Sequence, residues 1–231
     1  MKHKLPEAIV FDFDDTIYEY GAANRYAEAE LLRFIRIETS LDAEQISNAY
    51  KEARIEVKKK LGDTGSSHSR ILYINEMFRI LHLNPRPSFL LKAEQIFWSK
   101  YMQQMKLRPG FQEFLATVRH LKIKLILVSD LTLQVQLKKL LALGLDSAFD
   151  EIYVSEELGG DKVTGIPIKH LKHRFAVYKS IWFIGDKPHD FLEVSLENTF
   201  FIFGNDFSDV RESTQKISSF QELNKMILKL S

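Results

Sequence analysis

The chain has 231 residues, 45% of them hydrophobic and 27% charged, and its 32 basic residues nearly balance its 31 acidic ones for a net charge of +1. This balance disfavours a nucleic-acid-binding protein, which usually carries a strong basic excess. Cysteine is absent, which excludes disulfides, thiolate catalysis and zinc–thiolate sites. No stretch reaches the ~18 uncharged apolar residues of a membrane-spanning helix, and the N-terminus lacks the apolar segment of a signal peptide. We therefore expect a soluble, cytoplasmic protein with neither a membrane nor a nucleic-acid partner.

The first part of the chain predicts one strand followed by a long helical segment. Residues 8–11, with the sequence AIVF, form a short apolar run typical of a buried strand. Residues 20–106 contain no comparable run. Their apolar residues recur at helical spacing in four stretches, which are residues 22–37, 42–61, 67–83 and 88–105. We expect residues 20–106 to form an all-helical domain inserted into a core made of residues 1–19 and 107–231.

The remainder of the chain alternates strands and helices. Four further apolar runs predict strands at residues 125–128, 152–154, 181–184 and 200–203. Continuous rather than alternating hydrophobicity is typical of strands that are covered on both faces. Helical segments are expected at residues 131–143, where Leu133, Leu137, Leu140 and Leu141 supply the apolar positions, and at residues 188–196 and 219–230. This order predicts an α/β fold with a doubly wound, mostly parallel sheet.

Acidic and hydroxyl side chains follow three of the five predicted strands. Asp12 and Asp14 follow the first, Ser129 the second, and Asp186 and Asp190 the fourth. Ligands bind at the carboxyl ends of the strands in open parallel sheets, so these side chains should share one edge. Clustered carboxylates repel one another unless a cation neutralises them, and an oxygen-only site favours Mg²⁺.

The spacing of Asp12 and Asp14 suggests a division of labour. At a strand end the chain can splay the two carboxylates around a reacting group, so that one attacks while the other handles a proton. The alternative is a solvated turn in which Thr16 caps a helix. Three acids directly after an apolar strand are costly without a cation, which favours the chemical interpretation.

Four segments together resemble the motifs of the haloacid dehalogenase superfamily. Residues 8–16, AIVFDFDDT, are similar to its first motif, four hydrophobic residues followed by DxDxT. Residues 128–130, VSD, resemble the second motif, and residues 156–162, EELGGDK, the segment that delivers the third-motif lysine. Residues 184–190, IGDKPHD, resemble the fourth. The motifs occur in order beside the expected strands and span almost the whole chain.

The resemblance implies a Rossmann-like core, a helical cap of the family's first class, and a role for each motif residue. Asp12 would be the nucleophile that forms an aspartyl-phosphate, and Asp14 the acid and base. Ser129 and Lys162 would bind the phosphate, with Lys169 as the rival lysine. The Mg²⁺ ligands would be Asp12, the backbone carbonyl of Asp14, Asp186 and Asp190.

The resemblance also reduces the range of reactions to be considered. Dehalogenases of the superfamily generally lack an acid at the place of Asp14, because a halide leaving group needs no proton. We therefore expect a phosphatase acting on a small phosphorylated metabolite such as a sugar phosphate, a nucleotide or phosphoglycolate. A sugar phosphomutase and a non-catalytic binding or regulatory module remain alternatives, and the oligomeric state stays open.

Overall fold

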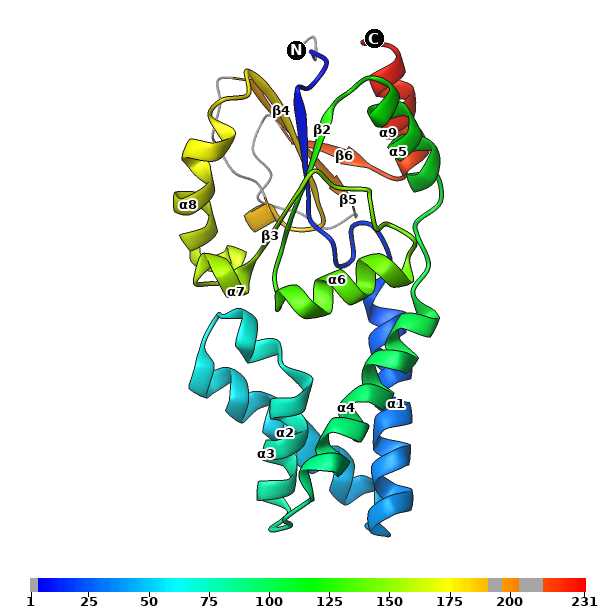
Figure 1. Ribbon diagram of the computed structural model, residues 1–231, viewed down its shortest axis with the longest axis vertical. Coiled ribbons are helices and arrows are strands. Elements are labelled where there is room, and N and C mark those ends of the chain that lie inside the picture. The colour runs from blue at the N-terminus through cyan, green and yellow to red at the C-terminus, as the bar shows by residue number, and fades with distance from the viewer. Residues whose placement is uncertain (1–3, 191–196, 204–213) are drawn as a thin grey trace. The chain divides into compact units, whose positions relative to one another are not determined.

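The computed structural model describes residues 4–190, 197–203 and 214–231 (Figure 1). The chain divides into two compact units. Residues 1–19 and 106–231 form an α/β unit, and residues 20–105 form a helical unit. Among the described residues, no helix is both long and apolar enough to cross a membrane.

The α/β unit is built on a six-stranded sheet in the order β3-β2-β1-β4-β5-β6. Every pair of neighbouring strands is parallel. The strands are β1 (Ala8–Phe11), β2 (Lys124–Ser129), β3 (Glu151–Val154), β4 (Ser180–Gly185), β5 (Glu197–Phe203) and β6 (Thr214–Ile217). The chain winds outward from β1 in both directions, which confirms the predicted doubly wound α/β fold and puts the switch point between β1 and β4.

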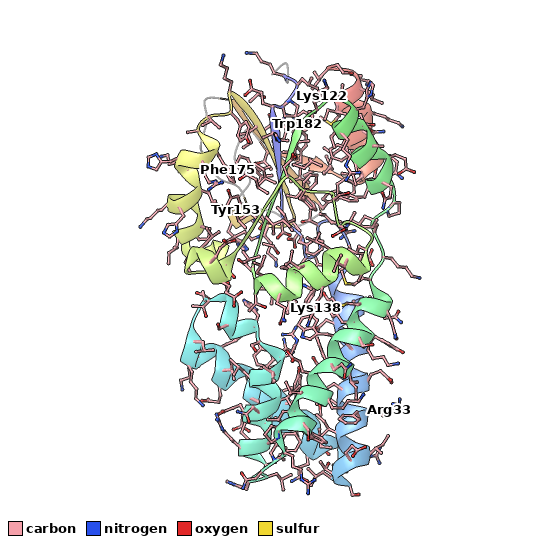
Figure 2. All side chains as sticks on the ribbon, in the orientation of Figure 1. Arg33, Lys122, Lys138, Tyr153, Phe175 and Trp182 are labelled. Carbon is pink, nitrogen blue, oxygen red and sulfur yellow. The ribbon has the colours of Figure 1, made fainter. Side chains whose placement is uncertain are left out.

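Helices cover both faces of this sheet (Figure 1). Val10 on β1 belongs to a buried cluster with Leu171 and Phe175 of α8. Phe11, on the opposite face of the same strand, contacts aromatic rings of α5 and α9 at centroid distances of 6.0–6.2 Å. Figure 2 labels Phe175 and Tyr153, whose rings meet edge to face at 6.3 Å. The helices are α5 (Phe111–His120), α6 (Leu133–Ala142), α7 (Ser155–Leu158), α8 (Ile166–Phe175) and α9 (Phe220–Leu228).

Three details of this unit differ from the sequence-based expectation. The strand β6 was not predicted, because its sequence TQKI has no apolar run and most of it is only partly buried. Of the helix predicted at residues 188–196, the structure describes only Pro188–Asp190, which form a 3₁₀ turn, and residues 191–196 lie outside the described residues. Leu133, Leu137 and Leu141 of α6 are exposed and only Leu140 of the four leucines is buried, so most of the apolar positions of this helix do not lie on its buried face.

The helical unit contains α1 (Tyr20–Thr39), α2 (Ala43–Leu61), α3 (Arg70–Ile80), α4 (Pro87–Gln104) and a 3₁₀ turn at Gly65–His68. Arg70 lies buried at its centre, 4.9 Å from the ring centroid of Phe97 and 5.3 Å from that of Tyr73. Its guanidinium donates to the Tyr20 hydroxyl at 2.9 Å and to Asn24 at 3.0 Å. A buried cation thus ties the start of α1 to α3 and α4 through neutral partners.

Candidate active site

Asp12 occupies the first position after β1, at the carboxyl edge of the sheet. Its backbone N–H donates to the carbonyl of Ile184 on β4 at 2.9 Å, which continues the strand pairing by one residue. The side chain is only 7% exposed. The buried hydroxyl of Thr16 donates to Oδ2 of Asp12 at 2.9 Å, and this bond fixes the carboxylate in one orientation.

Lys162 reaches Asp12 from a 3₁₀ turn (Lys162–Thr164) after α7. Its backbone N–H donates to Oδ1 of Asp130 at 2.9 Å, which anchors the turn to the end of β2. Its buried ammonium pairs with Asp12 and Asp190. Burial alone would lower the pKa of Lys162, but these carboxylates raise it well above its usual value. Lys169, the rival lysine, is exposed on α8.

Asp190 is held against the end of β4. Its Oδ2 accepts the backbone N–H of Asp186 at 3.1 Å and that of Lys187 at 2.8 Å, while Oδ1 faces Lys162. A Cβ placed on Gly185 would meet the Cβ and Oδ2 of Asp190 at 2.5 Å. Glycine is therefore required at the end of this strand because the aspartate side chain occupies the space of a side chain there.

The structure brings Asp12, Asp186 and Asp190 together. Among the described residues, these form the one group of three or more potential metal-ligating side chains, with carboxylate oxygens within 4.8 Å of one another. Burial, and then the charge of Asp190, raises the pKa of Asp186 to about 6. Burial likewise raises the pKa of Asp12, despite its pairing with Lys162. An all-oxygen set of close carboxylates fits a hard divalent cation, which would relieve their repulsion.

Asp14 lies beside this group, but other residues hold its carboxylate. The Nζ atom of Lys139 on α6 lies 2.9 Å from Oδ1 and 3.0 Å from Oδ2, and the Tyr18 hydroxyl also donates to Oδ1. Burial would raise the pKa of Asp14, but the Lys139 ammonium and the Tyr18 hydroxyl lower it overall. Asp14 is therefore a carboxylate with fixed orientation.

Ser129 ends β2 and is 2% exposed. The side-chain amide of Gln136 on α6 donates to its Oγ at 2.6 Å and to the carbonyl of Asp130 at 2.7 Å. Since Oγ accepts from Gln136, the serine hydroxyl keeps its proton to donate. In the structure it meets the Asp130 carbonyl at the long distance of 3.2 Å, so a better acceptor could displace that contact.

Three residues that touch this site, Gln136, Lys139 and Tyr18, were missed in the sequence analysis. Gln136 and Lys139 are both fully buried and lie three positions apart on α6, where they share a face. The sequence did contain an indication of these two residues, since two polar side chains three positions apart lie on one face of a helix. The leucines of the same helix offered a competing and more familiar pattern.

The chain is similar to known hydrolases. The family model described as haloacid dehalogenase-like hydrolase matches residues 9–195. Ribulose-1,5-bisphosphate 5-phosphatase of Halopiger xanaduensis is 32% identical over 163 residues, which cover 70% of this chain and 68% of that protein. Glyceraldehyde 3-phosphate phosphatase of Methanopyrus kandleri is 28% identical over 159 residues, 68% of this chain and 64% of that protein. The second match therefore spans just under two thirds of that relative's length.

Solved structures share the fold. A crystal structure of a HAD-hydrolase from Bacillus subtilis bound to magnesium superimposes with a TM-score of 0.65. It is 19% identical, and the match covers 99% of this chain and 100% of that one. The family model covers most of the chain, and the curated relative at 32% identity supports the same assignment. This chain therefore belongs to the haloacid dehalogenase-like hydrolases.

Proposed function

We propose that this chain is a Mg²⁺-dependent phosphatase that hydrolyses a small phosphate monoester through an aspartyl-phosphate on Asp12. The observation that carries the proposal is the buried contact of Lys162 with Asp12 inside a group of carboxylates. A carboxylate that attacks a phosphate dianion meets strong repulsion, so cations must stand beside both. Lys162 is one such cation, and a metal ion bound by the carboxylates of Asp12, Asp186 and Asp190 would be the other.

In the first step, an Oδ atom of Asp12 attacks phosphorus and the bond from phosphorus to the leaving oxygen breaks. Thr16 keeps the carboxylate in its orientation through Oδ2. Lys162 and the Ser129 hydroxyl bind phosphoryl oxygens as charge builds on them. Asp14, which must carry a proton when the ester binds, gives that proton to the departing alkoxide, which leaves as the alcohol, and Asp14 becomes a carboxylate.

In the second step, water attacks the phosphorus of the aspartyl-phosphate. Asp14 takes a proton from that water, the bond from phosphorus to Asp12 breaks, and inorganic phosphate leaves with the Asp12 carboxylate restored. The carboxylate form of Asp14, which Lys139 and Tyr18 stabilise, is the form that this step needs.

The carboxylates of Asp12, Asp186 and Asp190, with the backbone carbonyl of Asp14, would hold the Mg²⁺ ion. When bound, the ion supplies positive charge to the phosphoryl oxygens and neutralises the acid group. The oxygen-only donor set and the raised pKa of Asp186 support this assignment.

The proposed substrate is a phosphorylated short sugar. Both curated relatives are named as phosphatases of such molecules. We propose further that the helical segment, residues 20–106, serves as the cap that selects the leaving group, and that residues 1–19 and 107–231 form the catalytic core. A cytoplasmic location suits a substrate of this kind and a chain without cysteine.

The test is phosphate release from ribulose 1,5-bisphosphate, glyceraldehyde 3-phosphate and p-nitrophenyl phosphate, with and without Mg²⁺, by wild type and Asp12→Asn. We expect Mg²⁺-dependent release of inorganic phosphate that Asp12→Asn abolishes, and no chloride release from chloroacetate. Phosphate found on a second sugar instead of in solution would indicate a mutase. Activity retained in Asp12→Asn would exclude Asp12 as the nucleophile.

A further inference from the structure

Lys139 is a buried lysine that lies outside the four segments that resemble the motifs of the family. Its side chain is 0% exposed, and its ammonium meets both carboxylate oxygens of Asp14. The same ammonium lies 5.9 Å from the ring centroids of Phe13 and Tyr18. A fully buried ammonium is costly, so its position requires close compensation by the carboxylate and the aromatic faces.

Tyr18 holds the same carboxylate from a second direction. Its hydroxyl donates to Oδ1 of Asp14, and its ring is fully buried against Phe13 at a centroid distance of 5.3 Å. Its backbone forms isolated bridges with Asp14 and Leu107, which fix the loop after β1. Lys139 and Tyr18 together form what we call the Asp14 clamp.

The clamp separates Asp14 from the neighbouring acids. The close carboxylates of the described residues are those of Asp12, Asp186 and Asp190, and Asp14 is not among them. Without the clamp, rotation about the side-chain bonds of Asp14 could turn its carboxylate toward a bound cation. Proton transfer needs the carboxylate within hydrogen-bond reach of the leaving oxygen instead.

We propose that Lys139 and Tyr18 are positioning residues that hold Asp14 for proton transfer to the leaving group. The proposal rests on the proposed phosphatase function and adds two residues to its site. Lys139 acts through Asp14 and does not touch the substrate. Its loss therefore affects esters in proportion to their need for a proton on the leaving oxygen.

Leaving-group dependence provides a readout that a general structural role would not produce. A p-nitrophenolate leaves readily without a proton, whereas the alkoxide of a sugar phosphate does not. The quantity kcat/KM reports only the steps up to release of the alcohol, so it isolates the first proton transfer from the second.

The experiment compares Lys139→Met with wild type on p-nitrophenyl phosphate and on whichever sugar phosphate the wild type hydrolyses faster. Methionine is an unbranched side chain of nearly the same length that carries no charge. We expect kcat/KM for the sugar phosphate to fall about 10²-fold and that for p-nitrophenyl phosphate by less than about threefold. Lys139→Arg, which keeps the charge and paired donors, should retain more sugar-phosphate activity than Lys139→Met. The matched control is Lys138→Met, an exposed neighbour on α6 (Figure 2), which should change neither value.

A double-mutant cycle tests whether Lys139 acts through Asp14. In an Asp14→Asn background, Lys139→Met should add no further loss in kcat/KM for the sugar phosphate. Equal losses for the two esters, or an additive loss in the Asp14→Asn background, would overturn the proposal. If Lys139→Met does not fold, Tyr18→Phe removes a single hydroxyl from the clamp and should give the same selective loss. Failure of wild type to hydrolyse any ester would instead overturn the proposed function.

Discussion

The side chain of Asp190 occupies the space that a side chain on Gly185 would need at the end of β4. A Cβ on Gly185 would lie 2.5 Å from both the Cβ and Oδ2 atoms of Asp190. Because Gly185 has no side chain, the Asp190 side chain packs directly against the end of the strand. There it accepts hydrogen bonds from two backbone N–H groups and pairs with Lys162. The second aspartate of the GDxxxD pattern can therefore take up this position only because the first residue of the pattern is glycine.

Gly185→Ala should displace Asp190 and weaken cation binding. The overpacked contact should cost about 1–3 kcal/mol of stability, and the Mg²⁺ concentration for half-maximal activity should rise about tenfold or more. The control is Gly144→Ala, which meets nothing within 4 Å but sits at φ +69°. It should cost about 1 kcal/mol through backbone strain without changing the Mg²⁺ requirement. An unchanged requirement in Gly185→Ala would show that Asp190 is not confined by the glycine.

Thr16→Val should lower the reactivity of Asp12 by the same factor for every ester, whatever its leaving group. Valine has nearly the shape of threonine but cannot donate to Oδ2 of Asp12, so the carboxylate loses its fixed orientation. We expect kcat/KM for p-nitrophenyl phosphate and for a sugar phosphate to fall by the same factor, about tenfold. Thr16→Ser keeps the hydroxyl and should stay close to wild type. A loss confined to the sugar phosphate would assign Thr16 to leaving-group protonation instead.

The metal-free protein should become less stable as the pH rises from about 4 to about 6. Burial, and then Asp190, raises the pKa of Asp186 from its ordinary 3.8 to about 6 in the folded protein. Within this window the folded state binds more protons at Asp186 than the unfolded chain does, so the free energy of unfolding falls with rising pH.

Thermal melting of EDTA-treated protein across this range measures the effect. Asp186→Asn should reduce the fall, and Mg²⁺ should stabilise wild type more at pH 7 than at pH 5, because protons compete for its ligands. Equal Mg²⁺ stabilisation at both pH values would contradict the assignment of Asp186 as a ligand.

Arg70→Met should destabilise the helical unit. The change removes hydrogen bonds to Tyr20 and Asn24 and the contacts of the guanidinium with aromatic rings, for a cost of about 2–4 kcal/mol. Arg33→Met is the control, since the Arg33 side chain on α1 (Figure 2) is exposed, and it should leave the stability of the helical unit unchanged.

The chain has two tryptophans, Trp98 in the helical unit and Trp182 in the α/β unit. Urea unfolding followed by fluorescence in a shared Trp182→Phe background therefore reports the helical unit. A transition of Arg70→Met that coincides with that of Arg33→Met would contradict the central role of Arg70.

The strands of the sheet were predictable from sequence where burial on both faces leaves a continuous apolar run, as at Ala8–Phe11. The edge strand β6 escaped because an edge needs no such run. Lys162 could not be separated from Lys169 by spacing alone. The backbone bond from Lys162 to Asp130 sets the path of the turn, and that contact joins residues far apart in the sequence.

The orientation of α6 was the least predictable feature of the site. Its leucines and its polar residues both recur at helical spacing, so periodicity could not decide which set is buried. Two contacts determine which face of α6 is buried. Asp14 pairs with Lys139, 125 positions away in the sequence, and Ser129 accepts a hydrogen bond from Gln136. The structure thus brings Asp12, Asp186, Asp190 and Lys162 together, while the catalytic roles of the predicted site residues remain predictions.

The most direct test of the account is detection of the phosphoryl group on Asp12. Asp14→Asn should still be phosphorylated by p-nitrophenyl phosphate, whose leaving group needs no acid, but should lose the base that activates water. Acid quenching during turnover with Mg²⁺, followed by peptide mass spectrometry, should place the phosphoryl group on Asp12. Release of p-nitrophenol with no phosphoryl group on that residue would contradict the account.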